Sequence, residues 1–123
     1  MEDSDEYPIK IIRGASFIRE ITYTDEDKVP INLSNCHAEL QVRESALSTT
    51  PLLSISDEEG SITFVDAAGQ IIINVLPEDT AVLELIECAV YDLKLTTAEG
   101  EVLRLLRGPV KIVPLISQDE ESL

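Results

Sequence analysis

The sequence predicts an all-β domain, a sandwich or barrel of antiparallel strands, and three observations lead to this prediction. Apolar and polar residues alternate with a period of two in several segments, as in strands with one buried and one wet face. Turn-forming residues separate these segments at intervals of about 8–12 residues. The length of 123 residues allows one compact domain, and 44% of the residues are hydrophobic. Since only 4% are aromatic and Trp is absent, we expect an aliphatic core.

Nine segments have the composition and alternation of strands. The clearest is 36–43, where Cys36, Ala38, Leu40 and Val42 alternate with polar residues, and 89–96 has the same pattern. In chain order, the expected strands are 9–12, 17–23, 36–43, 52–55, 62–65, 70–75, 89–96, 101–106 and 110–113.

Polar turns join several of these segments. They lie at 25–28, 57–60, 66–69 and 97–100, and three of them end in glycine, which suits a residue with positive φ. One segment has helical signals instead, because Pro77 precedes Glu78 and Asp79 in what would be a first turn. We therefore expect one short helical turn near 77–84.

The charge is strongly acidic, with 24 Asp and Glu against 9 Lys and Arg and a net charge of −15. Acidic residues gather at both ends, which predicts solvated arms at 1–7 and 117–123 around a single domain at 8–116. Such a chain repels nucleic acid and anionic membranes, so we expect neither as a partner. No apolar run approaches the roughly 18 residues of a membrane span, and no signal-peptide pattern opens the chain, so we expect a soluble protein without a cleavable signal.

Candidate catalytic and metal-binding residues are few. His37 is the only histidine, and its neighbour Cys36 points to the opposite face of a strand, so the two cannot form a nucleophilic pair. Cys36 and Cys88 are expected as buried free thiols, with a disulfide between neighbouring strands left open. The acidic loops lack calcium-loop spacing. We therefore expect no enzyme activity, no cofactor and no metal.

A protein interface is the functional alternative for the arginines, because arginine is enriched at interfaces. Arg104 and Arg107 flank Leu105 and Leu106, and the other reading is that each arginine pairs with a cross-strand acid. Segments 9–12 and 110–113 lie beside prolines, so we expect both as edge strands that either add a partner strand or are protected from one. The candidate interface residues are Arg13, Arg104, Arg107, Ile9, Ile11, Val110 and Ile112.

A series of phrases, taken in order, resembles the N-terminal domain of upper baseplate proteins, which attach receptor-binding modules to the tails of bacteriophages. The phrases are Arg13-Gly14-Ala15-Ser16-Phe17, Pro30-Ile31-Asn32-Leu33-Ser34, Leu40-Gln41-Val42-Arg43, Gly69-Gln70-Ile71-Ile72-Ile73, Glu78-Asp79-Thr80, Tyr91-Asp92-Leu93-Lys94-Leu95-Thr96, and Gly100 followed by Val102 and Arg104. They span about residues 9–113. Upper baseplate proteins usually continue into a helical or fibre region, a pattern that is not found after Ser117.

The resemblance implies an immunoglobulin-like β-sandwich and an assembly role without catalysis. It further implies a tail, baseplate or fibre-attachment component of the virion, assembled in the bacterial host cytoplasm and present in several copies among other virion structural proteins. A capsid decoration protein is one alternative, and a small calcium- or carbohydrate-binding module is another.

Overall fold

A computed structural model describes residues 7–45 and 47–114, apart from the side chains of Ile86 and Glu87. The expected arms at 1–7 and 117–123 lie outside this range except for Tyr7. The described chain forms eight strands, a 3-10 turn and one helical turn. In order these are β1 (Ile9–Ile12), β2 (Phe17–Thr22), β3 (His37–Arg43), β4 (Leu53–Ser56), β5 (Ile62–Val65), η1 (Asp66–Ala68), β6 (Gln70–Val75), α1 (Pro77–Thr80), β7 (Ile86–Thr96) and β8 (Val102–Val113).

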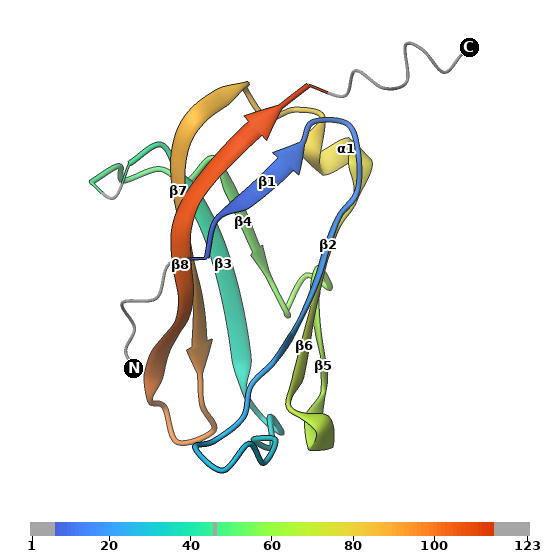
Figure 1. Ribbon diagram of the computed structural model, residues 1–123, viewed down its shortest axis with the longest axis vertical. Helices are drawn as coiled ribbons and strands as arrows, with labels where there is room; N and C mark the ends of the chain where they lie inside the picture. The colour runs from blue at the N-terminus through green and yellow to red at the C-terminus, as the bar shows by residue number, and fades with distance from the viewer. Residues whose placement is uncertain (1–6, 46, 115–123) are drawn as a thin grey trace.

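The strands form two sheets that face each other, as Figure 1 shows. The larger sheet has the order β1-β8-β7-β3-β4, and the smaller has the order β2-β6-β5. Here β2, β6 and β5 take the places of strands B, E and D of an immunoglobulin domain, while β3, β7 and β8 take those of C, F and G. The protein is therefore an immunoglobulin-like β-sandwich, as expected.

The structure corrects three details of this prediction. β1 pairs with β8 in parallel, from Ile9 opposite Val110 to Ile12 opposite Val113, so the sandwich is not wholly antiparallel. The helical turn ends at Thr80 rather than near residue 84, and β7 already begins at Ile86. The segments 101–106 and 110–113 belong to one continuous strand, β8.

Pro109 does not interrupt β8, because its backbone nitrogen points away from β7, the strand with which β8 forms most of its hydrogen bonds. The carbonyl of Arg107 faces β1, since it accepts the N–H of Tyr7 at 2.8 Å. Hydrogen-bonding groups alternate along a strand, so Pro109 also turns its nitrogen away from β7. Its missing N–H therefore removes no bond to β7, and proline does not end the strand.

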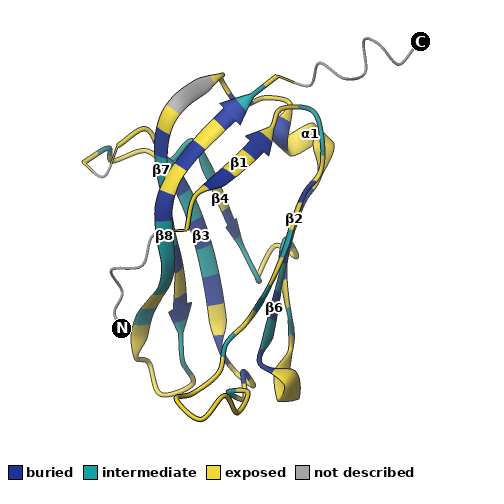
Figure 2. Ribbon diagram, viewed as in Figure 1, coloured by how far each residue is buried: buried dark blue, intermediate teal, exposed yellow. Residues whose placement is uncertain are grey.

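The core between the sheets is aliphatic, as the composition predicts. Alternate residues of β3, β6 and β7 are buried, which Figure 2 shows as alternating colours along the strands. The largest fully buried side chains are Ile11, Leu33, Ile62, Ile71, Ile73, Leu93 and Leu95 with Val42, Val75, Val110 and Thr80. Burial of each large aliphatic side chain contributes roughly 1.5–3 kcal/mol, so the core holds the sheets together without a disulfide.

Both cysteines are free thiols. Cys36 is buried as expected, but Cys88 is exposed, so the prediction that both are buried is wrong. Ala89 points into the core, and side chains alternate along β7, so Cys88 faces outward.

Candidate protein interface

The outer face of the larger sheet carries most of the positive charge of the protein. Residues that alternate with the buried ones on β1, β3, β7 and β8 point to this face. Six of the nine Lys and Arg residues are among them: Lys10, Arg43, Lys94, Arg104, Arg107 and Lys111. Among the side chains that the structure describes, the acidic residues at the same positions of these strands are Glu39 and Asp92. We call this surface the basic face.

Strand pairing brings the six cations of the basic face together from distant parts of the chain. Lys10 of β1 lies directly opposite Lys111 of β8, so two like charges are neighbours. Lys94 of β7 lies opposite Arg104 on one side and Glu39 on the other, and its Nζ is 3.3 Å from the Glu39 carboxylate. Like charges that face each other across strands destabilise a sheet, so the basic face is not arranged for stability alone.

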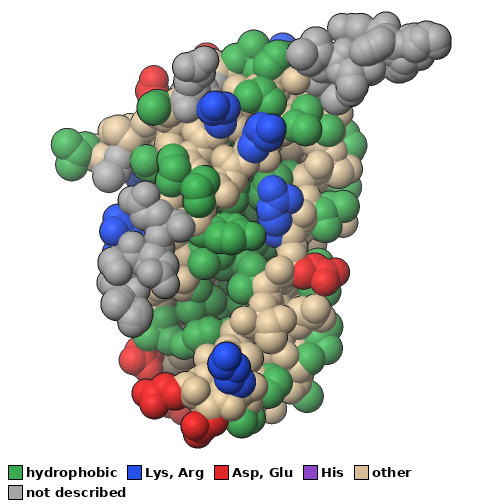
Figure 3. Space-filling view, in the orientation of Figure 1, with side chains coloured by type: hydrophobic (Ala, Val, Ile, Leu, Met, Phe, Trp, Pro, Cys, Tyr) green, Lys and Arg blue, Asp and Glu red, His purple; other side chains and the backbone are tan. Residues whose placement is uncertain are grey.

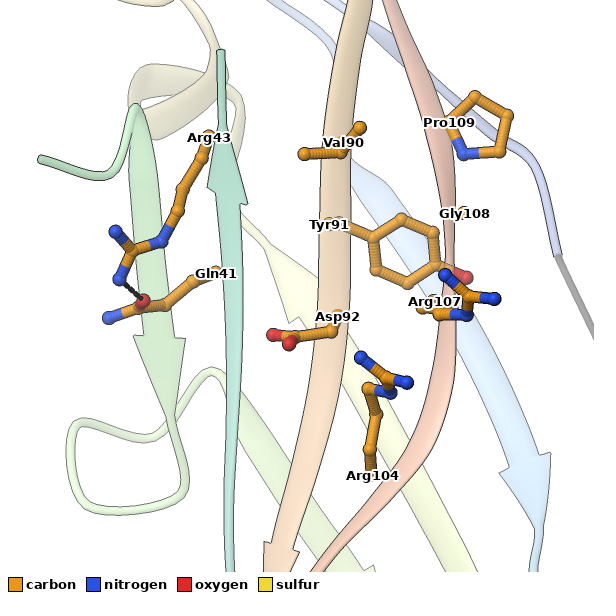
Figure 4. A pocket seen from close by; sticks show the side chains of 9 residues that line it. All are labelled: Gln41, Arg43, Val90, Tyr91, Asp92, Arg104, Arg107, Gly108 and Pro109. Atoms are coloured by element: carbon orange, nitrogen blue, oxygen red, sulfur yellow. Dashed lines mark hydrogen bonds between the residues drawn. The ribbon is translucent and has the colours of Figure 1, made fainter. Parts of the chain in front are cut away.

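A recess of about 400 Å³ opens in this face. β3 contributes Gln41 and Arg43, β7 contributes Asp92, and β8 contributes Arg104 and Arg107. In Figure 4 the side chains of Arg104 and Arg107 extend from β8 beside β7, with the Asp92 carboxylate between Arg104 and Gln41 in this view. The lining is completed by Val90 and Tyr91 of β7 and by Gly108 and Pro109 of β8.

The arginines of the recess differ in how they are held. Arg43 donates to the Ser48 carbonyl and to Oε1 of Gln41, which fixes its guanidinium. The Nε of Arg107 is buried without a hydrogen-bond partner among the described residues. A guanidinium binds a carboxylate through two parallel hydrogen bonds, and both Arg104 and Arg107 line the recess. The recess is therefore suited to an acidic side chain.

A β-bulge places Arg104 and Arg107 on the same face. They are three residues apart, so a regular strand would point them to opposite faces. On β7 their partners are Lys94 and Asp92, which are only two residues apart, and the register shifts between Leu93 and Lys94. The extra residue in β8 restores the alternation. The sequence named both arginines as interface candidates, and the structure places both on the basic face.

The other five candidate residues lie elsewhere. Arg13 follows β1, where its guanidinium donates to the Leu83 carbonyl at 3.4 Å, away from the recess. The remaining four belong to the core: Ile9, Ile11, Val110 and Ile112. Their side chains point between the sheets, so an interface could use only the backbone there. β1 is an edge strand as expected, but 110–113 is not, because β8 lies between β1 and β7.

The expectation that His37 is a surface residue agrees with its position. Its side chain is 61% exposed, and Nδ1 lies 3.0 Å from Oδ2 of Asp57. The other oxygen of Asp57 accepts the N–H of Ala38 at 2.9 Å. Burial raises the pKa of Asp57, but these hydrogen bonds together outweigh burial, so the pKa lies below its ordinary value. The pair anchors the loop after β4 to the start of β3.

The acidic loop after β2 has a structural explanation. Oδ1 of Asp25 accepts the N–H groups of Asp27 and Val29, at 2.8 and 3.0 Å, and Lys28 adopts a φ of 67°. The carboxylate thus closes its own turn. Within residues 7–45 and 47–114, no group of three or more His, Cys, Asp or Glu side chains could hold a metal ion. None of the helices in this part of the chain is long and apolar enough to span a membrane.

No protein-family model matches the sequence, and no curated protein matches it. Among solved structures, the chain is similar to Drosophila OTK, extracellular domains 3–5, with 14% identity and a TM-score of 0.34. The match covers 87% of this chain and 32% of that chain. The assignment of the fold therefore depends on the strand order given above.

Proposed function

We propose that this protein is a non-enzymatic structural protein of a tailed-bacteriophage virion, an adaptor at the tail, the baseplate or the fibre attachment. It acts in several copies through protein–protein contacts, and the basic face is its docking surface. The resemblance of its sequence phrases to upper baseplate proteins supports the virion setting. The distribution of charge supports the docking surface.

The segregation of the cations is the observation that carries this proposal. The chain has a net charge of −15, yet six of its nine cations share one face of one sheet. Because Lys10 and Lys111 are direct neighbours, an approaching acidic surface relieves their repulsion. Complementary charge steers association and fixes the relative orientation of partners. The partner is therefore a protein with an acidic surface.

The recess defines how the partner is held. Arg104 and Arg107 line it from the same strand, and an Asp or Glu side chain that enters it meets two guanidinium groups. Arginine at such a position offers planar, bidentate recognition that lysine does not. Loss of a charge-assisted contact of this kind weakens binding by at least about tenfold, since 1.4 kcal/mol corresponds to a factor of ten.

The test is binding of the full chain to disrupted virions of its source. Light scattering gives the mass of the protein alone, and negative-stain microscopy shows where it binds on separated tails and heads. Three forms are compared: wild type, Arg104→Glu, and Lys28→Glu as the control. Lys28 lies in an exposed turn outside the basic face, and both substitutions change the net charge by the same amount.

We expect wild type and Lys28→Glu to form ring-like decoration on detached tails, and Arg104→Glu to bind at least tenfold more weakly. Raising the salt concentration weakens this binding, since exposed charges are screened. Binding to heads instead of tails would assign the protein to capsid decoration. A monomer that binds neither would remove the virion function and leave the fold.

A further inference from the structure

One edge of β8 is only half covered. β1 pairs with its C-terminal part, from Val110 to Val113, and the Tyr7 N–H reaches the Arg107 carbonyl at 2.8 Å. Residues 102–106 have β7 on one side and no partner strand among the described residues on the other. Figure 1 shows β8 continuing well below the start of β1. Among the described residues, this stretch therefore has backbone hydrogen-bonding groups without a neighbouring strand.

The inner side of this open edge is apolar. β2 of the opposite sheet lies across from this edge, since Ile21 of β2 and Leu106 of β8 line the same small void. Partly buried side chains pack against the core there: Ile21 of β2, Tyr23 just after it, and Leu105 and Leu106 of β8. Figure 3 shows the hydrophobic surface in the hollow between the sheets. The void beneath measures only about 10 Å³, so it admits no large side chain. Apolar groups of an added strand would cover its mouth.

The outer side of the same edge is basic. Arg104 is exposed and Arg107 is half-buried, and both point to the basic face. A strand laid along 102–106 would place every second side chain toward the apolar hollow and the others beside these two arginines. This edge of β8 therefore favours an added strand in which apolar residues alternate with acidic ones.

We propose that residues 102–106 of β8 take up an extended segment of a partner protein, in which apolar and acidic residues alternate, as an added strand. Backbone hydrogen bonds supply affinity, and the alternating side chains supply selectivity. The inference deepens the proposed function and rests on it for the acidic character of the partner. The arginines also discourage pairing with basic strands or with a second β8 edge, which limits unwanted association.

The test is an NMR titration of the full, ¹⁵N-labelled chain with a synthetic probe, acetyl-Glu-Val-Glu-Ile-Glu-Val-amide. We expect shift changes in the amides of 103–107 and at Ile21. A probe with Lys in place of Glu should bind at least tenfold more weakly. For Arg104→Glu this preference should reverse, and for the control Lys28→Glu it should not change.

Backbone methylation distinguishes strand addition from simple charge attraction. In an extended probe all acidic residues direct their N–H groups to one edge, and all apolar residues direct theirs to the other. We prepare one probe N-methylated at the acidic residues and one N-methylated at the apolar residues. Only one should lose binding, by at least tenfold, and its identity gives the direction of the added strand.

Equal binding of the two methylated probes, or shifts confined to Gln41, Arg43 and Asp92, would overturn strand addition and leave docking on the basic face intact. Hydrogen exchange gives a second outcome that would overturn strand addition. The amides of 103–107 would resist exchange in the full chain and lose this protection when residues 1–6 are removed. The chain would then cover its own edge. Strand addition of the probe without any binding to virions would instead contradict only the virion function.

Discussion

Replacing Gly108 with alanine tests how β8 holds the chain segment that precedes β1. Gly108 is buried, and a Cβ added there would lie 2.7 Å from the carbonyl oxygen of Tyr7 and 2.9 Å from its carbonyl carbon. Both atoms belong to the backbone, so no side-chain rotation can relieve the contact. We expect Gly108→Ala to displace Tyr7 from β8.

Two hydrogen bonds depend on the position of Tyr7. Its carbonyl accepts the Tyr91 hydroxyl at 2.7 Å, and its N–H donates to the Arg107 carbonyl at 2.8 Å. Tyr91 is only 4% exposed, so an unpaired hydroxyl there costs about 1–3 kcal/mol. The backbone bond adds about 1 kcal/mol, and alanine returns about 0.4–1 kcal/mol by restricting the unfolded chain. We therefore expect a loss of about 1–4 kcal/mol in the free energy of unfolding.

The assay is equilibrium unfolding in urea, with Tyr91→Phe and the double variant completing a mutant cycle. Tyr91→Phe alone should cost about 1–2 kcal/mol, and clearly less in the Gly108→Ala background, where the hydroxyl has already lost its acceptor. Gly60→Ala is the control. Gly60 has a φ of +98°, so alanine strains the backbone there, but the added Cβ meets no atom within 4 Å and displaces no neighbouring segment. That control should leave the cost of Tyr91→Phe unchanged. A Gly108→Ala variant as stable as wild type, or strictly additive costs in the cycle, would refute this reasoning.

Three further outcomes are expected. Thr80→Val should lower the free energy of unfolding, measured by urea titration, by about 2–4 kcal/mol. The buried hydroxyl of Thr80 accepts the Gly14 N–H at 2.9 Å and donates to the Ala15 carbonyl at 2.8 Å, and valine leaves both groups unpaired. Thr80→Ser keeps the hydroxyl and should retain most of that stability. Because the pKa of Asp57 is lowered in the folded state, its carboxylate stabilises the fold at pH values above its unfolded pKa of about 4. This stabilisation is lost as the pH falls toward the folded pKa. Between pH 6 and 3, the free energy of unfolding of Asp57→Asn should therefore fall less than that of wild type. In the folded protein an aromatic disulfide reagent should modify Cys88 rapidly and Cys36 only after unfolding, because Cys88 is exposed and Cys36 is buried; equal rates would contradict this burial.

Local patterns were sufficient for most of the strands. The segments 9–12, 62–65 and 70–75 match β1, β5 and β6 in both bounds, because alternation and flanking turns are properties of neighbouring residues. Proline misled the prediction at 107–109, since its effect on a strand depends on which neighbour its nitrogen faces. The exposure of Cys88 follows from the same alternation, once Ala89 is known to point inward.

The candidate site was predictable only in part. The alternation in β3 and β7 already assigns Arg43 and Lys94 to a wet face, but it does not show that these strands are neighbours. Lys10 and Lys111 are about a hundred positions apart in the chain, and only the parallel pairing of β1 with β8 makes them adjacent. Of the six cations of the basic face, the sequence identified only Arg104 and Arg107 as interface candidates. The other four were not identified: Lys10, Arg43, Lys94 and Lys111.

The sequence by itself determined the all-β class, the aliphatic core and the acidic charge, because composition and period-two alternation do not depend on distant partners. Tertiary structure alone decided where the positive charge gathers. A bulge in β8 turns Arg104 to the side of Arg107, and the order of strands brings β1, β8, β7 and β3 into one surface. Register and strand order are set by packing between the sheets, so contacts across the whole chain, rather than neighbouring residues, define the basic face.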